Sequence, residues 1–294
     1  MPLFTDQLGR TITLDHPPQR IISLVPSQTE LLYSLGLQTA VTGITKFCIH
    51  PEEWFRSKTR IGGTKNIRFD TIRDLQPDLI LANKEENVKE QIDELALLYP
   101  VWVSNIQTLD DALAMIRSVG AITGKEETGD ELAMEINRRF TALAGQLQSD
   151  NTDCTHSRST GNSGHSGSTG NSIPGKAPLA AYFIWRKPWM VAGGDTFIDN
   201  MLQKAGFKNA FRDRSRYPAI ELESLARSGC ELILLSSEPY PFKDHHIAEI
   251  REAVPDASIQ LVDGEMFSWY GSRLLEAPGY FLKLRETLAK IPPL

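Results

Sequence analysis

The sequence predicts an α/β protein of two similar lobes with parallel sheets, joined by one long α-helix, with a ligand cleft between the lobes. Short apolar runs alternate with helical segments on both sides of a low-complexity stretch at residues 149–178, a rhythm typical of parallel sheets. One uninterrupted helical pattern precedes that stretch. At 294 residues the chain reaches the size of roughly 250–300 residues at which single cores stop growing, so we expect two lobes.

The N-terminal lobe is expected over residues 1–124 and contains a buried strand at 21–25. Ser27 and Glu30 have the S-x-x-E spacing of a capping box, which predicts a helix that ends at Gly36. The next strands and helices are predicted at 41–44, 69–76, 79–82, 86–98, 101–103 and 109–123. The C-terminal lobe is expected over residues 179–294, with apolar runs at 180–184, 232–235 and 259–262 and helices near 196–205 and 242–252.

A single connecting helix is predicted over residues 125–148, because apolar residues recur there at helical spacing. They are Leu132, Ile136, Phe140, Leu143 and Leu147. Residues 149–178 are instead rich in Ser, Gly, Asn and Thr and carry too few apolar side chains to order themselves. We expect a low-complexity flexible insertion there, without a chemical role.

A local repeat relates the two halves of the chain. Asp70 and Glu223 lie 153 residues apart, as do Asp78 and Glu231 (223 − 70 = 231 − 78 = 153), and the residues between them are similar. The pattern indicates an internal duplication.

Composition excludes several classes of function. A net charge of −6 and the absence of a dense Lys/Arg run argue against nucleic acid as a partner. The chain has no run of about 18 apolar residues, so no membrane-spanning segment is expected. It starts at Met1 without a basic segment leading into an apolar one. This start favours a cytoplasmic location over a periplasmic or lipid-anchored one, which would require a leader that has been removed.

Three motifs carry a resemblance to a known family. They are Asp6–Leu14 (DQLGRTITL), Arg20–Glu30 (RIISLVPSQTE) and the pair Ile61–Gly63 and Leu75–Ile80 (IGG and LQPDLI). With Val41–Ile44 and the long helix, they resemble the helical-backbone class of ABC-transporter substrate-binding proteins, and within it the cobalamin-type branch. The resemblance implies a monomer that is not an enzyme, has no intrinsic cofactor and hands a metal-chelate nutrient to an ABC permease dimer. It also implies that Asp70 and Glu223 dock onto the permease, although each would equally suit a helix N-terminus.

Candidate ligand contacts follow the apolar runs, because ligands of open α/β sheets bind beyond the carboxyl ends of the strands. The apolar and aromatic candidates are Trp185, Trp189, Met190, Tyr217, Phe267, Trp269 and Tyr270. The polar and charged candidates are Lys46, His50, Thr64, Lys65, Asn83, Ser236, Glu265 and Arg273. By the resemblance, Thr64 and Asn83 stand where aromatic residues line the corrinoid site, while His50 and Met190 stand where a Tyr and a Phe are expected.

The expected ligand is cobalamin or another corrinoid, since the candidate cations have acids nearby in sequence, such as Glu85 beside Lys84 and Glu265 near Arg273. The alternative is a ferric siderophore or haem, for which Lys46, Lys65, Arg186 and Arg273 would supply positive charge.

Enzymes and protein metal sites are weaker hypotheses. The same two-lobed geometry also occurs in cytoplasmic metallocluster enzymes and nucleotide-sugar transferases, but the chain has no GxSxG and no CxxC motif. Cys48 and His50 could each bind a metal, yet a protein-only site needs three or four ligands, so no metal site is expected. His50 is predicted instead to contact the ligand or its axial group.

Overall fold

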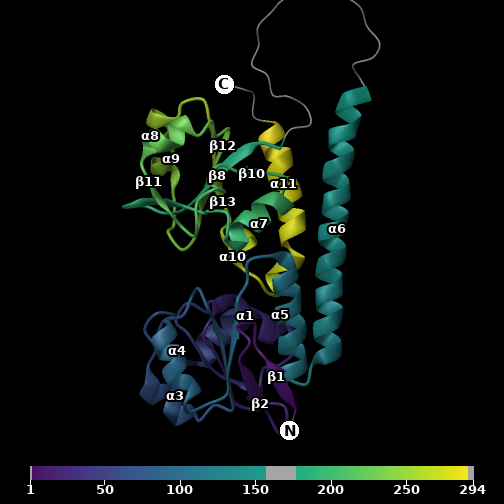
Figure 1. The fold of residues 1–294 in the computed structure, drawn as a ribbon, viewed down its shortest axis with the longest axis vertical. Helices are drawn as coiled ribbons and strands as arrows, with labels where there is room; N and C mark the ends of the chain where they lie inside the picture. Colours follow the sequence, from purple (N-terminus) through teal and green to yellow (C-terminus); the bar gives the residue numbers. More distant parts are fainter. Residues whose placement is uncertain (1, 157–176, 291–294) are drawn as a thin grey trace, which may run out of the picture. The chain divides into compact units, whose positions relative to one another are not determined.

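The computed structural model describes residues 2–156 and 177–290, and the chain splits into two compact units. Unit 1 comprises Met1–Asn137 and Trp269–Leu275, and unit 2 comprises Arg138–Ser268 and Glu276–Leu294. Figure 1 follows the chain through both units by colour. The division differs from the expected lobes at Trp269–Leu275, which the sequence places in the C-terminal lobe and the structure in unit 1. Most of the expected insertion at 149–178 lies outside the described residues.

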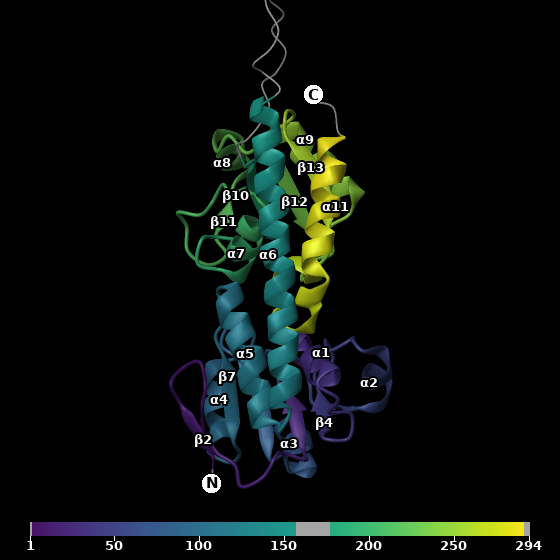
Figure 2. The ribbon, with the colours of Figure 1, turned by 90° about the vertical axis from the view of Figure 1, so that its right-hand side faces the viewer.

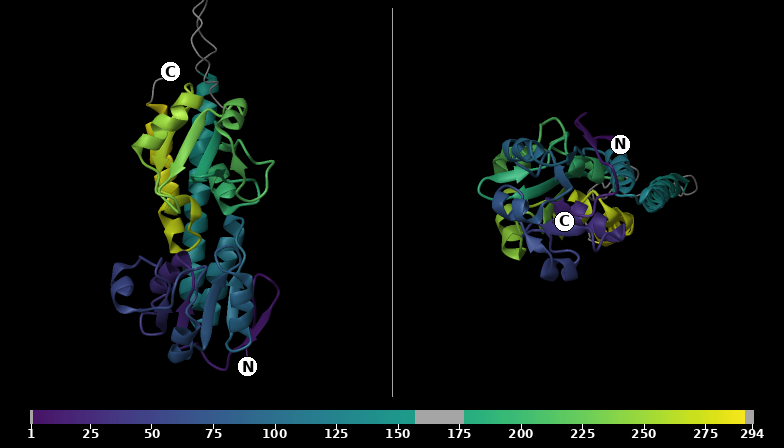
Figure 3. Two further views of the ribbon diagram at one scale, coloured as in Figure 1. Left: turned by 90° about the vertical axis from the view of Figure 1, so that its left-hand side faces the viewer. Right: turned by 90° about the horizontal axis from the view of Figure 1, so that it is seen from below.

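Unit 1 is built on a parallel sheet. In the described part of this unit, five strands lie in the order β5-β4-β3-β6-β7 and every neighbouring pair is parallel. The strands are β3 (Ile21–Ser23), β4 (Val41–Ile44), β5 (Thr59–Arg60), β6 (Leu79–Asn83) and β7 (Val101–Ser104). Every residue of β3, β6 and β7 is buried, as expected where helices cover both faces of a parallel sheet. Helices lie on either side of the sheet in the left panel of Figure 3.

A hairpin and a set of helices complete unit 1. The antiparallel hairpin is formed by β1 (Leu3–Thr5) and β2 (Thr11–Thr13). The helices are α1 (Pro26–Ser34), α2 (Glu52–Ser57), α3 (Phe69–Leu75), α4 (Lys89–Ala96) and α5 (Leu109–Ile122), with the 3-10 turn η1 (Ser272–Leu275). The predicted strands and helices of this half are therefore present.

The predicted capping box at the start of α1 is wrong. The helix begins at Pro26, and among the described residues no side chain caps its N-terminus at Val25. Proline suits this first position because its fixed φ is already helical. Glu30 pairs with Arg273, 243 positions later in the chain.

Unit 2 has a mixed sheet. Over the described residues of this unit, five strands lie in the order β11-β9-β8-β12-β13, and a sixth strand, β10, also pairs with β8. The strands are β8 (Leu179–Trp185), β9 (Trp189–Val191), β10 (Lys208–Asn209), β11 (Ala219–Ile220), β12 (Leu232–Ser236) and β13 (Ser258–Val262). The pairs that involve β10, β12 and β13 are parallel. β9 and β11 add an antiparallel edge that was not predicted.

The helices of unit 2 follow the predicted alternation. They are α7 (Phe197–Lys204), α8 (Leu222–Arg227), α9 (Asp244–Ala253), α10 (Glu265–Ser268) and α11 (Ala277–Ala289). The hydrophobic core on one side of the sheet joins strand residues such as Phe183 and Ile233 to Leu225 of α8 and Ile250 of α9.

The long helix α6 (Glu126–His156) is continuous, as predicted, but it extends eight residues beyond the expected end at 148. Residues 149–156 contain neither Gly nor Pro, and an established helix propagates through residues of moderate propensity. Near the start of α6, Gly129 lies so close to Gly120 of α5 that a Cβ on Gly120 would stand 3.1 Å from the Gly129 Cα. In unit 2, α6 runs beside α11 (Figure 2), with Phe140 and Phe281 in edge contact at 6.5 Å. Within the described residues, no helix is both long and apolar enough to span a membrane.

Candidate functional site

The loops at the carboxyl ends of the central strands hold most of the candidate residues. In unit 1 they follow β4, β5 and β6, and in unit 2 they follow β8, β12 and β13. Within each unit these strands are parallel, so their loops share one edge of that unit's sheet.

Asn83, the last residue of β6, shapes the loop that follows. Its side chain is buried. The Nδ2 donates to Ser104 Oγ at 2.9 Å, and the Oδ1 accepts the backbone N–H groups of Glu85 and Glu86 at 2.8 and 3.1 Å. The amide of Asn83 already bonds protein groups through its donor and its acceptor. Asn83, which the sequence predicts to contact the ligand, thus positions the loop. The carbonyl of Thr64, another candidate, accepts a bond from Asn87 at 3.1 Å in the same network.

Ser236 lies at the equivalent position at the end of β12, 153 residues after Asn83 (236 − 83 = 153), and it also bonds the loop that follows. Its buried hydroxyl donates to the carbonyl of Glu238 and accepts the hydroxyl of Tyr182 at 3.0 Å. Burial strongly raises the pKa of Tyr182, so this phenol remains a neutral donor. Ser236 therefore also positions a loop, with its hydroxyl bonded to protein groups.

The segment Trp269–Leu275 packs inside unit 1. Trp269 is only 6% exposed, and its ring lies 5.8 Å from that of His50 and 5.3 Å from the guanidinium carbon of Arg273. Arg273 binds Glu30 through two bonds of 2.6 and 3.2 Å. The acid that neutralises Arg273 is thus Glu30, whereas the sequence pointed to Glu265.

Tyr270 belongs to the same segment and ties it to the loop after β6. Its hydroxyl donates to Glu86 Oε1 at 2.7 Å. Burial, and then the neighbouring Glu86 carboxylate, raise the pKa of Tyr270 well above its usual range. Trp269, Tyr270 and Arg273 therefore contact the loops after β4 and β6 and helix α1 from within unit 1.

The loop after β4 presents an exposed apolar surface that sequence reasoning missed. Phe47 and Ile49 are 50% and 46% exposed and flank the buried Cys48. His50 follows them and is half-buried. The ammonium of Lys46 lies 5.0 Å from the centre of the Phe47 ring. The only available signal was two apolar residues in a loop that directly follows a strand.

Lys65 lies in the loop after β5 and is exposed. Its ammonium donates to the carbonyl of Glu85 at 2.6 Å, which links this loop to the one after β6.

Unit 2 presents aromatic side chains at the end of β8. Trp185 is 41% exposed, with its ring 5.6 Å from that of Tyr240, a residue that the sequence did not single out. Trp189 stacks on Phe242 at 6.1 Å and carries the Arg186 guanidinium 5.3 Å from its ring. Two bonds of 2.6 and 3.0 Å join Arg186 to Glu249.

The other candidates of unit 2 differ in accessibility. Phe267 is fully buried against Tyr182 and Phe281, so it belongs to the core. Met190, Tyr217 and Glu265 are half-buried. These three keep an accessible side, as a ligand contact requires.

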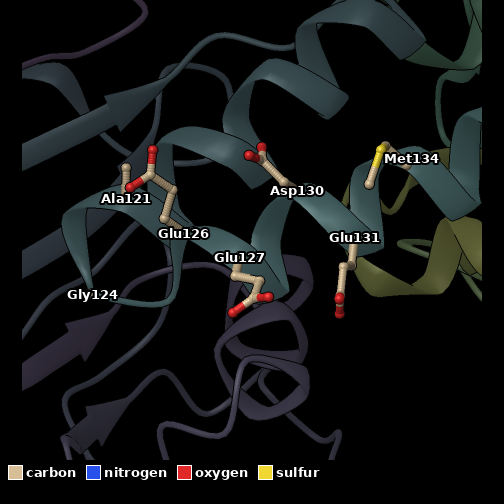
Figure 4. A pocket seen from close by; sticks show the side chains of 7 residues that line it. All are labelled: Ala121, Gly124, Glu126, Glu127, Asp130, Glu131 and Met134. Atoms are coloured by element: carbon tan, nitrogen blue, oxygen red, sulfur yellow. The ribbon is translucent and has the colours of Figure 1, made fainter.

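A separate pocket lies where α5 turns into α6. Its lining is formed by Ala121, Gly124, Glu126, Glu127, Asp130, Glu131 and Met134. Figure 4 shows that the carboxylates of Glu126 and Asp130 point to one side and those of Glu127 and Glu131 to the other. Asp130 also lies 3.4 Å from Arg117. Across the described residues, no group of three or more His, Cys, Asp or Glu side chains is arranged to hold a metal ion.

The two acids expected to dock onto a permease occupy equivalent positions. Asp70 lies in the first turn of α3 and Glu223 in the first turn of α8, and both are exposed. Asp70 is bonded to Arg73 at 3.0 Å, but its side chain remains 94% exposed.

Sequence comparisons identify related proteins along nearly the whole chain. A family model described as periplasmic binding protein matches residues 21–254. An uncharacterized ABC transporter substrate-binding lipoprotein of Bacillus subtilis is 25% identical over 283 residues, covering 92% of this chain and 81% of the relative. A vitamin B12-binding protein of Vibrio campbellii is 24% identical over 243 residues, covering 81% of this chain and 78% of the relative.

Solved structures share the fold. The periplasmic vitamin B12-binding protein of Vibrio cholerae aligns with a TM-score of 0.73 at 20% identity, covering 94% of this chain and 99% of the other. A periplasmic heme-binding protein of Pseudomonas aeruginosa aligns with a TM-score of 0.74 at 18% identity, covering 94% and 95%. The predicted α/β fold class is confirmed.

Proposed function

This chain belongs to the periplasmic binding protein family, and we propose that it binds a corrinoid and delivers it to an ABC permease. The observation that carries the choice of ligand is the internal neutralisation of two candidate guanidinium groups. Arg273 is bonded to Glu30 and Arg186 to Glu249. An anionic ferric chelate or haem would instead need cations that converge on it.

The accessible side chains suit a large, weakly charged ligand. Trp185 in unit 2 and Phe47 and Ile49 in unit 1 expose apolar surface at the ends of strands. Corrinoids carry amide side chains around an apolar macrocycle, so they require stacking surfaces and scattered hydrogen bonds. The relatives named as vitamin B12-binding proteins support the same choice.

A ferric siderophore or haem is the second candidate. Lys46 and Lys65 are exposed cations on loops of unit 1, and one of the structural relatives is named as a heme-binding protein. Calorimetric titration with cyanocobalamin, cobinamide, haem and a ferric hydroxamate separates the candidates. We expect saturable heat with the corrinoids, and a response to the ferric ligands alone would refute the corrinoid assignment.

On this proposal the chain is a receptor without catalytic activity, and its metal chelate is cargo. One relative is named as an ABC transporter substrate-binding lipoprotein, and the matching family model is described as periplasmic binding protein. We therefore propose an exported or lipid-anchored location, in place of the cytoplasmic one that the start of the sequence favoured.

Docking is proposed to use Asp70 and Glu223, which are exposed in the first turns of α3 and α8. The double variant Asp70→Lys/Glu223→Lys should abolish transport by the reconstituted permease and leave corrinoid affinity unchanged. Asp110→Lys/Asp244→Lys is the matched control, because these exposed acids also lie in first helical turns, one in each unit. A loss of ligand affinity in the first variant would assign its acids to the binding site or the fold.

A further inference from the structure

His50 occupies a position from which an imidazole could reach a ligand. It ends the loop after β4, at the carboxyl edge of the unit 1 sheet, and its side chain is half-buried. Imidazole nitrogen is the commonest protein donor to transition metals. A chelated metal already holds most of its ligands, so one protein donor is enough to fill an axial position.

The His50 ring belongs to a series of contacts inside unit 1. The His50 ring meets Trp269 edge to face at 5.8 Å and 66°. The guanidinium carbon of Arg273 lies 5.3 Å from the centre of the Trp269 ring. Two hydrogen bonds join Arg273 to Glu30. Histidines that bind metals are characteristically held by neighbouring groups that set the ring direction. The ring of His50 is therefore packed against a buried neighbour and is half-buried itself.

The surroundings of His50 suit a macrocycle. Phe47 and Ile49 expose 50% and 46% of their surface on the same loop. An axial nitrogen bordered by apolar side chains matches a flat tetrapyrrole, whose metal is central and whose faces are apolar.

We propose that His50 supplies an axial nitrogen ligand to the cobalt of an incomplete corrinoid, in which water occupies one axial position. The inference rests on the proposed corrinoid function. The bond between cobalt and the water oxygen breaks, and water leaves with its electron pair. A lone pair of the neutral imidazole then forms the Co–N bond. Cobalt remains Co(III), and nothing is oxidised or reduced.

The test is absorption spectroscopy of the full chain with aquacyanocobinamide, which has an exchangeable water, and with cyanocobalamin, which has both axial positions filled. We expect a shift of the visible bands with the first ligand only. His50→Phe keeps an aromatic edge for Trp269 but removes the nitrogen, so it should abolish the shift and raise the Kd for aquacyanocobinamide by about tenfold or more.

The controls separate this inference from the function on which it rests. His16→Ala removes an exposed histidine outside the site and should keep the shift, while His50→Gln provides a second variant should His50→Phe fail to fold. If both corrinoids bind but no shift occurs, or the shift survives in both His50 variants, the axial ligand is refuted and the receptor function stands. If neither corrinoid binds to the native chain, both proposals fall.

Discussion

The ends of β6 and β12 show how the two halves resemble each other and where they differ. Asn83 and Ser236 lie 153 positions apart, both are buried, and each holds the backbone of the loop after it. The loops themselves are unlike. The unit 1 loop carries Glu86, which Tyr270 binds, whereas the unit 2 loop carries Tyr240 beside the exposed Trp185. Small polar residues hold the backbone at the two equivalent positions, while the loops that they hold carry different side chains.

The two arginine–glutamate ion pairs also differ between the units, in how exposed they are. The side chains of Arg273 and Glu30 are 14% and 18% exposed, and those of Arg186 and Glu249 are 21% and 36% exposed. The unit 1 pair is thus part of the supporting structure, while the unit 2 pair lies nearer the surface. The arginine–glutamate pair of unit 1 is therefore the more buried of the two.

The largest expected effect contrasts Trp269 with Trp185. Trp269→Ala should lower the free energy of unfolding by about 3 kcal/mol, since it removes a buried aromatic side chain. Trp185→Ala should change it by less than ~0.5 kcal/mol and weaken corrinoid binding by more than ~1 kcal/mol. Urea unfolding followed by circular dichroism, together with calorimetry, measures both. An equal loss of unfolding free energy in the two variants would contradict the assignment of Trp269 to the interior and Trp185 to the surface.

An intermediate effect is expected where the two loops begin. Asn83→Ala removes the acceptor for two backbone N–H groups and should cost about 1–3 kcal/mol. Ser236→Ala removes one buried hydroxyl and should cost about 1 kcal/mol. Urea unfolding of the two variants compares them. If Ser236→Ala is the more damaging, the equivalence drawn between the two positions is wrong.

The smallest effect is a pH dependence in unit 2. Burial, and then the adjacent His245, lower the pKa of His246 below its usual value of about 6.5, and its Nδ1 accepts the Lys243 N–H at 2.9 Å. The unfolded chain therefore binds the proton more readily, so the contribution is complete above about pH 6.5 and is lost as the pH falls below it. Thermal unfolding at pH 7.5 and 5.5 should show a smaller acid-induced loss in His246→Gln than in the native chain. An identical loss in both would exclude His246 as its source.

Much of the fold could be predicted because its signals are local. The buried runs of β6 and β12 and the helical spacing of α6 are visible in short windows of sequence. The assignment of Trp269–Leu275 to unit 1 could not be predicted in this way. It depends on Arg273 meeting Glu30, 243 positions away, and on Tyr270 meeting Glu86, 184 positions away.

For the candidate residues, the sequence predicted the loops on which they lie better than it predicted their burial. The rule that ligands bind at the carboxyl ends of strands placed most of the candidates on loops after parallel strands, where the structure also has them. It could not tell that Asn83, Ser236 and Phe267 point inward, because burial is set by tertiary packing. The exposed Phe47 was missed for the same reason, since in sequence an apolar loop residue looks like part of the core.

The most direct test of the corrinoid assignment compares two ligands that share one ring. Calorimetric titration with dicyanocobinamide and with dicyanocobyrinic acid, in which carboxylates replace the amides, isolates the effect of ligand charge. Because Arg186 and Arg273 already have carboxylate partners, we predict that the amide ligand binds at least about tenfold more tightly. Tighter binding of the carboxylate form would contradict the account and favour an anionic chelate.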